Sequence, residues 1–161
     1  MSRILITGAT GNVGLELIRS LTGKSDTHLL VAGVRNVDKA RRVLKNDKLE
    51  YVRFDFESPD TFEHAFHQVD ILFLLRPPHI SEVKKIFEPL LISAQKKGIK
   101  KIVFLSVQGA EKSSIIPHHK IEKIILNKGF EYIFLRPAYF MQNLTTTLRK
   151  DIVKKNSIVL P

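Results

Sequence analysis

The chain has 161 residues, which is the length of one domain and enough to bury about 70% of its unfolded surface. It contains no cysteine, which excludes disulfide bonds and thiolate chemistry. A transmembrane helix needs an apolar run of about 18 residues, and the sequence contains none of that length. No apolar region typical of a signal peptide follows Met1. We therefore expect a single cytoplasmic domain over residues 1–161 with no membrane contact.

The formal net charge of +10 raises the question of nucleic-acid binding. The positive residues form short clusters without interleaved aromatic residues, at 39–42, 96–101 and 154–155. None of these clusters has the pattern of a nucleic-acid-binding module. We expect no nucleic-acid partner and interpret the charge as a lysine-rich surface, which still favours an anionic small ligand.

Short apolar runs alternate with amphipathic segments along the chain. Six runs predict strands, at residues 3–7, 29–34, 50–54, 70–75, 101–106 and 132–136. Most are continuously apolar, as in strands covered on both faces, whereas the run that begins at Glu50 is not and is expected near an edge. Six strands separated by helices predict an α/β fold with a doubly wound parallel sheet, helices on both faces and right-handed crossovers.

The segments between the runs carry helix signals. Helices are expected over residues 13–21, from Ser58–Pro59 onward, from Ser81 to Gly98 and from Pro117 to Gly129. Ser58 before a proline is typical of an N-cap, and Pro89 is expected to kink or split its helix. Residues 138–161 are more polar and predict a peripheral helix, through Thr145–Thr147, and a short apolar tail at 158–161.

The stretch ITGATGNVG, residues 6–14, has three glycines spaced three apart directly after the first apolar run. In a doubly wound sheet this first strand-to-helix turn lies where a nucleotide binds. Gly8 would permit the tight turn, Gly11 would let the backbone approach a pyrophosphate, and Gly14 would let the helix pack closely on the strand. The free N–H groups at the helix start, residues 12–13, would bind the phosphates. The flanking strands and helix favour a dinucleotide site over a turn that binds no ligand.

The end of the second strand bears on the choice of dinucleotide. Sites that prefer NAD usually carry an acidic residue there, but this chain reads Gly33-Val34-Arg35-Asn36. A guanidinium at Arg35 can hold a 2′-phosphate by charge-assisted hydrogen bonds, with Lys39 as a second contact. The alternative is an arginine in a solvated loop. We therefore expect NADP, bound as NADPH, rather than NAD.

Five stretches together resemble the NmrA-like branch of the atypical short-chain dehydrogenase/reductase superfamily, most of all its quinone-reductase-like and azoreductase-like members. They are TGATGNVG at 7–14, VRN at 34–36, Asp55, KKIVFLSVQGA at 100–110 and LRPAYFMQNL at 135–144. The resemblance implies a Rossmann-type fold with NADPH across the strand ends. It places residues 55–56 near the adenine, 75–77 beside the cofactor ribose and 137–140 around the nicotinamide. It also implies a C-terminal substrate lobe, which we expect to be absent from this chain.

In the superfamily a serine, a tyrosine and a lysine carry proton transfer, but no tyrosine here is followed by lysine four positions later. Ser106 lies where the family's serine would lie, with a strand-end hydroxyl bonded to local backbone as the alternative. His118 stands where many NmrA-like members have a lysine, and it can donate a proton near neutral pH. The alternative is an exposed polar first turn. Lys120 is expected at a ribose hydroxyl.

These inferences define the expected site. The catalytic candidates are Ser106, His118 and Tyr139. The cofactor-binding candidates are Gly8, Thr10, Gly11, Asn12, Val13, Gly14, Arg35, Asp55, Phe56, Leu75, Arg76, Lys120 and Pro137. No metal site is expected, because the adjacent His118 and His119 point to different sides of a helix and His64 with His67 lacks a third ligand.

Three functional interpretations remain open. The leading one is an NADPH-dependent reductase that passes a hydride to a quinone-like or related small-molecule electron acceptor. The second is a non-catalytic NADP-binding redox sensor or regulatory protein, favoured by the missing tyrosine–lysine pair. The third is an inactive reductase fragment that forms a homo-oligomer through an exposed sheet edge, with Phe134, Tyr139 and Phe140 as adhesive residues.

Overall fold

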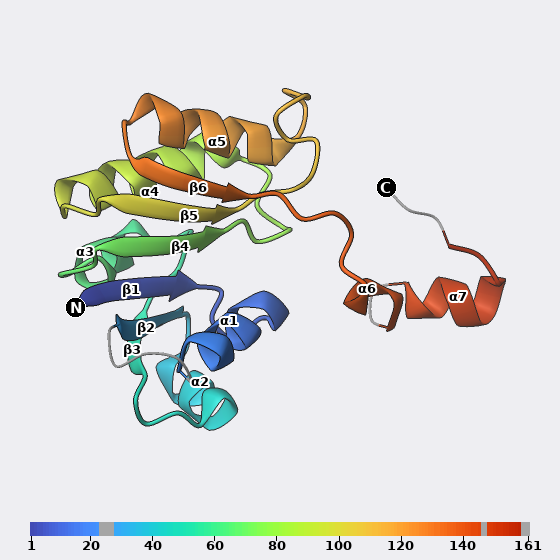
Figure 1. Cartoon of the computed structure of the whole chain (residues 1–161), viewed down its shortest axis with the longest axis horizontal. Coiled ribbons are helices and arrows are strands. Elements are labelled where there is room, and N and C mark those ends of the chain that lie inside the picture. The colour runs from blue at the N-terminus through green and yellow to red at the C-terminus, as the bar shows by residue number, and fades with distance from the viewer. Residues whose placement is uncertain (23–27, 146–147, 159–161) are drawn as a thin grey trace.

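The computed structural model contains a six-stranded sheet with helices on both faces and a C-terminal segment that extends away from it (Figure 1). It describes residues 1–22, 28–145 and 148–158. The strands are β1 (Ser2–Thr7), β2 (His28–Val34), β3 (Glu50–Arg53), β4 (Ile71–Leu75), β5 (Lys101–Leu105) and β6 (Glu131–Leu135). The helices are α1 (Asn12–Thr22), α2 (Val37–Leu44), η1 (Pro59–Thr61, a 3₁₀ turn), α3 (Phe62–Ala65), α4 (Val83–Lys96), α5 (Pro117–Asn127), α6 (Gln142–Thr145) and α7 (Arg149–Lys155).

All five strand pairs are parallel, and the strand order is β3-β2-β1-β4-β5-β6. The chain winds outward from β1 to β3, then crosses the sheet to β4 and winds outward to β6. The predicted doubly wound sheet is confirmed, and the run at Glu50 forms an edge strand as expected. The winding reverses between β1 and β4, where such sheets open a crevice at their carboxyl ends.

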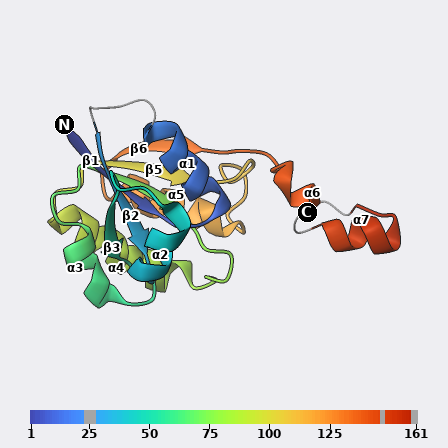
Figure 2. The ribbon, with the colours of Figure 1, turned by 90° about the horizontal axis from the view of Figure 1, so that it is seen from below.

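Alternation along each strand divides the core between two faces. Leu5, Leu72 and Phe104 point toward α3, α4 and α5, whereas Ile6, Ala32 and Phe73 point toward α1 and α2. Figure 2 shows the two groups of helices on opposite sides of the strands. Burial on both faces explains why the central strands read as continuous apolar runs.

Two local predictions hold only in part. Helix α4 continues across Pro89 instead of splitting, because Phe87, Leu90 and Leu91 on either side of it are fully buried in the core. Ser58 is the N-cap and Pro59 the first residue of the turn η1, as predicted, but the turn is 3₁₀ and the Ser58 side chain makes no cap hydrogen bond. The Ser58 carbonyl accepts a hydrogen bond from the N–H of Thr61 at 3.0 Å, which closes the turn, and a second one from Thr61 Oγ1 at 2.7 Å.

The polar C-terminal region forms two short helices, α6 and α7, which lie away from the sheet (Figure 1). Thr146–Thr147 of the predicted helix and residues 159–161 of the predicted tail lie outside the described residues. Among the helices that the structure describes, none combines the length and apolar character needed to cross a membrane.

Candidate functional site

The turn between β1 and α1 depends on its glycines. Gly8 adopts a φ of +63°, and its carbonyl accepts a hydrogen bond of 2.9 Å from the N–H of Gly11. A Cβ atom on Gly14 would lie 2.3 Å from the carbonyl oxygen of Gly8, so only glycine allows α1 to pack against the turn. The first intrahelical bond runs from Leu15 N–H to the carbonyl of Gly11. The N–H groups of residues 12–14 are therefore at the helix start, where an anion can accept them.

Thr7 joins β1 to β4 beside this turn. Its buried hydroxyl donates to the carbonyl of Phe73 at 3.0 Å and accepts from the N–H of Leu75 at 3.1 Å. The paired register of β1 and β4 ends one residue earlier, at Ile6 and Phe73. The side chain thus gives the Leu75 N–H, which lies beyond the paired register, a partner where β1 turns away at Gly8, and it also bonds the Phe73 carbonyl.

A cavity of about 270 Å³ opens at the carboxyl ends of β1 to β4. It brings together the predicted cofactor residues Gly8, Thr10, Gly11, Arg35, Asp55, Phe56 and Leu75. Its lining is completed by Gly33, Val34, Phe54, Pro77, Pro78 and His79. The sequence analysis missed Pro78 and His79, because a loop with no motif gives no sign of which strand end it will cover.

Arg35 lies at the rim of this cavity and is exposed. Within the described residues its guanidinium has no hydrogen bond or ion pair, so it is available to an anionic ligand. The next residue, Asn36, caps α2 by accepting a hydrogen bond of 2.8 Å from the N–H of Lys39. Asp55 is held in a turn, where its Oδ1 accepts from the N–H of Glu57 at 3.1 Å. The cavity therefore has a cation without a partner and a carboxylate held in a turn, at the ends of the neighbouring strands β2 and β3.

Arg76 and His118 lie close to each other next to the cavity, but neither lines it. The guanidinium of Arg76 donates to the carbonyls of Ile80 (2.9 Å) and Pro78 (3.1 Å), which ties it to the β4–α4 loop. His118 is half-buried, with its ring 5.9 Å from that of Phe104. Burial and the positive charge of Arg76 lower the pKa of His118, against the opposing effect of Glu122. Its imidazole is therefore neutral at neutral pH.

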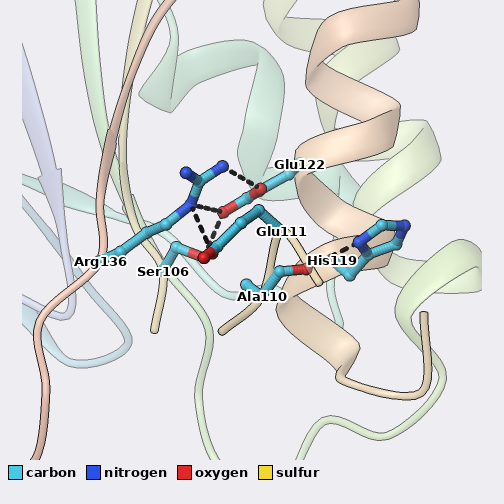
Figure 3. A network of polar contacts seen from close by, with 6 residues as sticks. All are labelled: Ser106, Ala110, Glu111, His119, Glu122 and Arg136. Atoms are coloured by element: carbon cyan, nitrogen blue, oxygen red, sulfur yellow. Dashed lines mark hydrogen bonds and ion pairs between the residues drawn. The ribbon is translucent and has the colours of Figure 1, made fainter. Parts of the chain in front are cut away.

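A buried polar network connects the ends of β5 and β6 to α5 (Figure 3). Ser106, only 1% exposed, donates from Oγ to Oε1 of Glu122 at 2.6 Å. Arg136 donates from Nε to Oε1 of Glu122 at 3.0 Å and from Nη2 to its Oε2 at 2.9 Å. Arg136 Nε also lies 3.5 Å from a carboxylate oxygen of Glu111. His119 is part of the same region, where its Nδ1 donates to the carbonyl of Ala110 at 2.7 Å.

The ionisation of Glu122 determines what Ser106 can do. Burial raises the pKa of Glu122, but hydrogen bonds from Arg136 and Ser106 and the positive charge of Arg136 outweigh it and keep the pKa below its ordinary value. The carboxylate is therefore charged, and the Ser106 hydroxyl donates its hydrogen bond to this carboxylate. A buried hydroxyl that donates to a carboxylate cannot donate the same hydrogen to a substrate. In this respect Ser106 differs from the serine expected in a proton-transfer triad.

The sequence analysis did not identify Glu122 and Arg136 as site residues. A signal was present, since Glu122 lies on the same helix face as the fully buried Ile121 and Ile125. A carboxylate on an apolar face needs a buried partner. The identity of that partner depends on the end of β6, which only the fold brings to the helix.

The remaining candidates lie outside the cavity, on the β5–β6 side. Pro137 accepts a hydrogen bond of 2.9 Å from the N–H of Gln108, which fixes the strand exit next to Ser106. Tyr139 is exposed on the following segment, and Lys120 is exposed on α5. The predicted residues therefore form two groups: one lines the cavity and the turn at β1–β4, and the other surrounds the ends of β5 and β6.

Comparison with known proteins gives a family match over residues 8–158, to a family described as NAD(P)H-binding. A relative from Dictyostelium discoideum, prestalk A differentiation protein A, is 31% identical over 158 residues, which are 98% of this chain and 52% of that protein. The chain spans about half the length of the curated relatives that it matches.

Two solved structures share the fold and carry the cofactor. The triphenylmethane reductase of Citrobacter sp. complexed with NADP(H) has a TM-score of 0.77 and 28% identity, over 95% of this chain and 55% of that one. The NADPH-dependent quinone oxidoreductase of Escherichia coli complexed with NADPH has a TM-score of 0.81 and 25% identity, over 94% and 54%. These relatives confirm the resemblance to the NmrA-like and quinone-reductase-like proteins.

Proposed function

The chain belongs to the NAD(P)H-binding family, and from this premise we propose that it binds NADPH and forms the cofactor half of a reductase for quinone-like or related small-molecule acceptors. The observation that carries the proposal is the cavity at the ends of β1 to β4, where the glycine turn, Asp55 and the unpaired guanidinium of Arg35 converge. Both solved relatives described above are complexes with NADP(H) or NADPH.

The residues of the cavity fit the parts of a phosphorylated dinucleotide. The N–H groups of residues 12–14 bind the pyrophosphate, Gly11 has no Cβ to obstruct its approach, and Gly14 lets α1 pack closely on the turn. Arg35 binds the 2′-phosphate with a charge-assisted hydrogen bond. Phe56 and the carboxylate of Asp55 lie on the side of the adenine, where the free Asp55 oxygen can accept from an amino group.

The second group of residues serves the nicotinamide side. When bound, NADPH supplies a hydride. The chain's part is to orient the ring and the acceptor near Tyr139 and His118, with Lys120 at a ribose hydroxyl. His118, neutral and next to Arg76, can donate a hydrogen bond to an acceptor, whereas the Ser106 proton is already bonded to Glu122.

A second candidate function is a non-catalytic NADP-binding sensor or regulatory protein. The specific observation in its favour is the state of Ser106, which is 1% exposed and bonded to an ionised carboxylate. A protein that binds the cofactor without turnover has no need of a proton donor at that position.

Cofactor preference tests the first part of the proposal. Titration of the protein with NADPH and NADH, followed by calorimetry or nucleotide fluorescence, should show tighter binding of NADPH. Arg35→Ala should weaken NADPH binding by about 10- to 100-fold, which corresponds to the loss of a hydrogen bond to a charged group, and should leave NADH nearly unchanged. Arg41→Ala is the matched control, because Arg41 stacks on Tyr51 at 4.8 Å and does not line the cavity. Equal affinity for the two nucleotides would refute the assignment of Arg35.

Turnover separates the two candidate functions. The reductase predicts steady NADPH oxidation in the presence of a panel of quinones and azo compounds, at a rate proportional to protein. Tight NADPH binding without oxidation by any acceptor would favour the sensor.

A further inference from the structure

The loop that follows β4 forms one wall of the cavity and begins with two prolines. Its residues 77–79 line the cavity. The next side chain, that of Ile80, is only 4% exposed and lies in the core. The N–H of Ile80 donates to the carbonyl of Pro77 at 3.1 Å, which closes a turn over these four residues. The loop is therefore attached to the core at Ile80, directly after the residues that border the site proposed for the nucleotide.

Arg76 supplies hydrogen-bond donors that the start of the loop lacks. Proline has no N–H group, so residues 77 and 78 cannot donate to a neighbouring carbonyl. From the position before them, Arg76 donates from Nε to the carbonyl of Ile80 at 2.9 Å and from Nη2 to the carbonyl of Pro78 at 3.1 Å. The two accepting carbonyls flank His79. Because the guanidinium is planar and rigid, one side chain fixes the path of the loop on both sides of His79.

The surroundings of Arg76 indicate that its role is to fix this loop. Within residues 1–22, 28–145 and 148–158, no carboxylate forms an ion pair with Arg76, and both of its hydrogen bonds go to uncharged carbonyls. Burial lowers the pKa of Arg76, so the position disfavours the cation and no acidic partner offsets this cost. The side chain also does not line the cavity. Arg76 is thus bonded to the wall of the cavity but does not reach the cavity itself.

We propose that Arg76 is a positioning residue for the cofactor: it holds residues 77–79 in place as a wall against which the nucleotide binds, and it does not contact the nucleotide. This inference rests on the proposed binding of NADPH, and it replaces the direct contact expected for Arg76 from the sequence. A wall that is ordered before binding removes the cost of ordering the loop in the complex. In the sheet, β1 lies between β4, which leads into the loop, and β2, which ends at Arg35. The wall should therefore contact parts that NADPH and NADH share, and not the 2′-phosphate.

Arg76→Lys tests this role, because lysine keeps the positive charge but lacks the planar pair of donors. Titration with NADPH and with NADH should show that both bind about tenfold more weakly to this variant, as expected for the loss of one hydrogen bond from a charged group. The ratio of the two affinities should stay at its wild-type value, whereas Arg35→Ala should change it. Arg41→Lys is the matched control and should bind both nucleotides normally, because Arg41 stacks on Tyr51 and does not line the cavity. Wild-type affinities in Arg76→Lys would overturn the inference and leave the proposed NADPH binding intact.

Two further measurements separate an effect on the loop from general damage to the fold. The charge of Arg76 helps to lower the pKa of His118, so Arg76→Lys, which retains that charge, should leave the NMR titration midpoint of His118 near its wild-type value. The amide of Ile80, whose hydrogen bond closes the turn, should exchange with solvent faster in Arg76→Lys than in the wild-type chain. Unchanged exchange, or a His118 midpoint that moves together with the affinity, would overturn the inference. A wild-type chain that binds neither nucleotide would refute the proposed function as well.

Discussion

Arg136, the first residue after β6, holds the buried carboxylate of Glu122 through two hydrogen bonds of 3.0 and 2.9 Å. The carboxylate belongs to α5 and is only 4% exposed, so its charge depends on this partner. The pair therefore fixes the direction in which the chain leaves β6 toward Pro137 and Tyr139.

Removal of Arg136 should destabilise the fold strongly. Arg136→Met leaves the Glu122 carboxylate buried without its cation, and we expect a loss of about 3 kcal/mol in the free energy of unfolding. This value is the lower end for a broken buried pair, because the Arg136 side chain is 35% exposed. Urea denaturation measures the loss. Lys85→Met is the control, because the Glu82–Lys85 pair is exposed and should contribute less than about 1 kcal/mol. Similar losses in the two variants would show that Glu122 is solvated.

Acidification should weaken the same contact. The pKa of Glu122 lies below its ordinary value of 4.5 in the folded chain, so its contribution to stability is complete above that value and is lost as the pH falls through the lowered pKa. The unfolding free energy of the wild-type chain, measured between pH 7 and pH 3, should therefore fall more steeply below about pH 4.5 than that of Glu122→Gln. Parallel curves for the two proteins would contradict the lowered pKa.

The pKa of His118 should respond to Arg76. Burial and then the Arg76 charge lower this pKa from 6.5 in the folded chain. As the pH falls below 6.5, His118 is therefore protonated more readily in the unfolded chain, and the free energy of unfolding declines. Arg76→Gln should raise the pKa of His118, observed by NMR titration of its ring protons. Arg41→Gln, which changes the charge by the same amount on α2, should leave the midpoint in place. An unchanged midpoint in Arg76→Gln would exclude the electrostatic contact.

Gly14→Ala should impair cofactor binding by moving α1. Its new Cβ would lie 2.3 Å from the carbonyl of Gly8, and backbone on both sides has to shift to admit it. Gly129→Ala is the comparison, because Gly129 has a φ of +73° but open space around it, so the substitution costs about 1 kcal/mol of backbone strain. NADPH titration of both variants should show a clear loss of affinity for Gly14→Ala alone. Equal affinities would mean that α1 does not need to approach the turn so closely.

The parts of this protein that could be predicted are those whose causes are local in sequence. The run at 71–75 reads as a buried strand because both of its faces are covered. Gly8 marks the turn because its φ is positive, and Gly14 marks it because neighbouring backbone leaves no room for a Cβ atom. The doubly wound parallel sheet followed from the alternation of strands and helices.

The parts that could not be predicted depend on residues that only the fold brings together. Ser106 and Glu122 are 16 positions apart, and their hydrogen bond depends on how α5 packs on β5. Without that contact, Ser106 reads as a free hydroxyl at a strand end. The same holds for His79, which lines the cavity because of the path of the β4–α4 loop. Helix α4 does not split at Pro89, because core packing outweighs one missing hydrogen bond.

The hydroxyl of Thr7 also has a consequence for how a crevice can exist in a close-packed sheet. The Thr7 hydroxyl accepts from the Leu75 N–H, which lies beyond the paired register, and donates to the Phe73 carbonyl, so the strands separate without leaving this amide unpaired. The crevice thus forms where β1 and β4 separate, and the core between the strands needs no cavity of its own. Valine has almost the same shape as threonine, but it has no hydroxyl group and can make neither hydrogen bond. A side chain that fits the space at this position is therefore not sufficient.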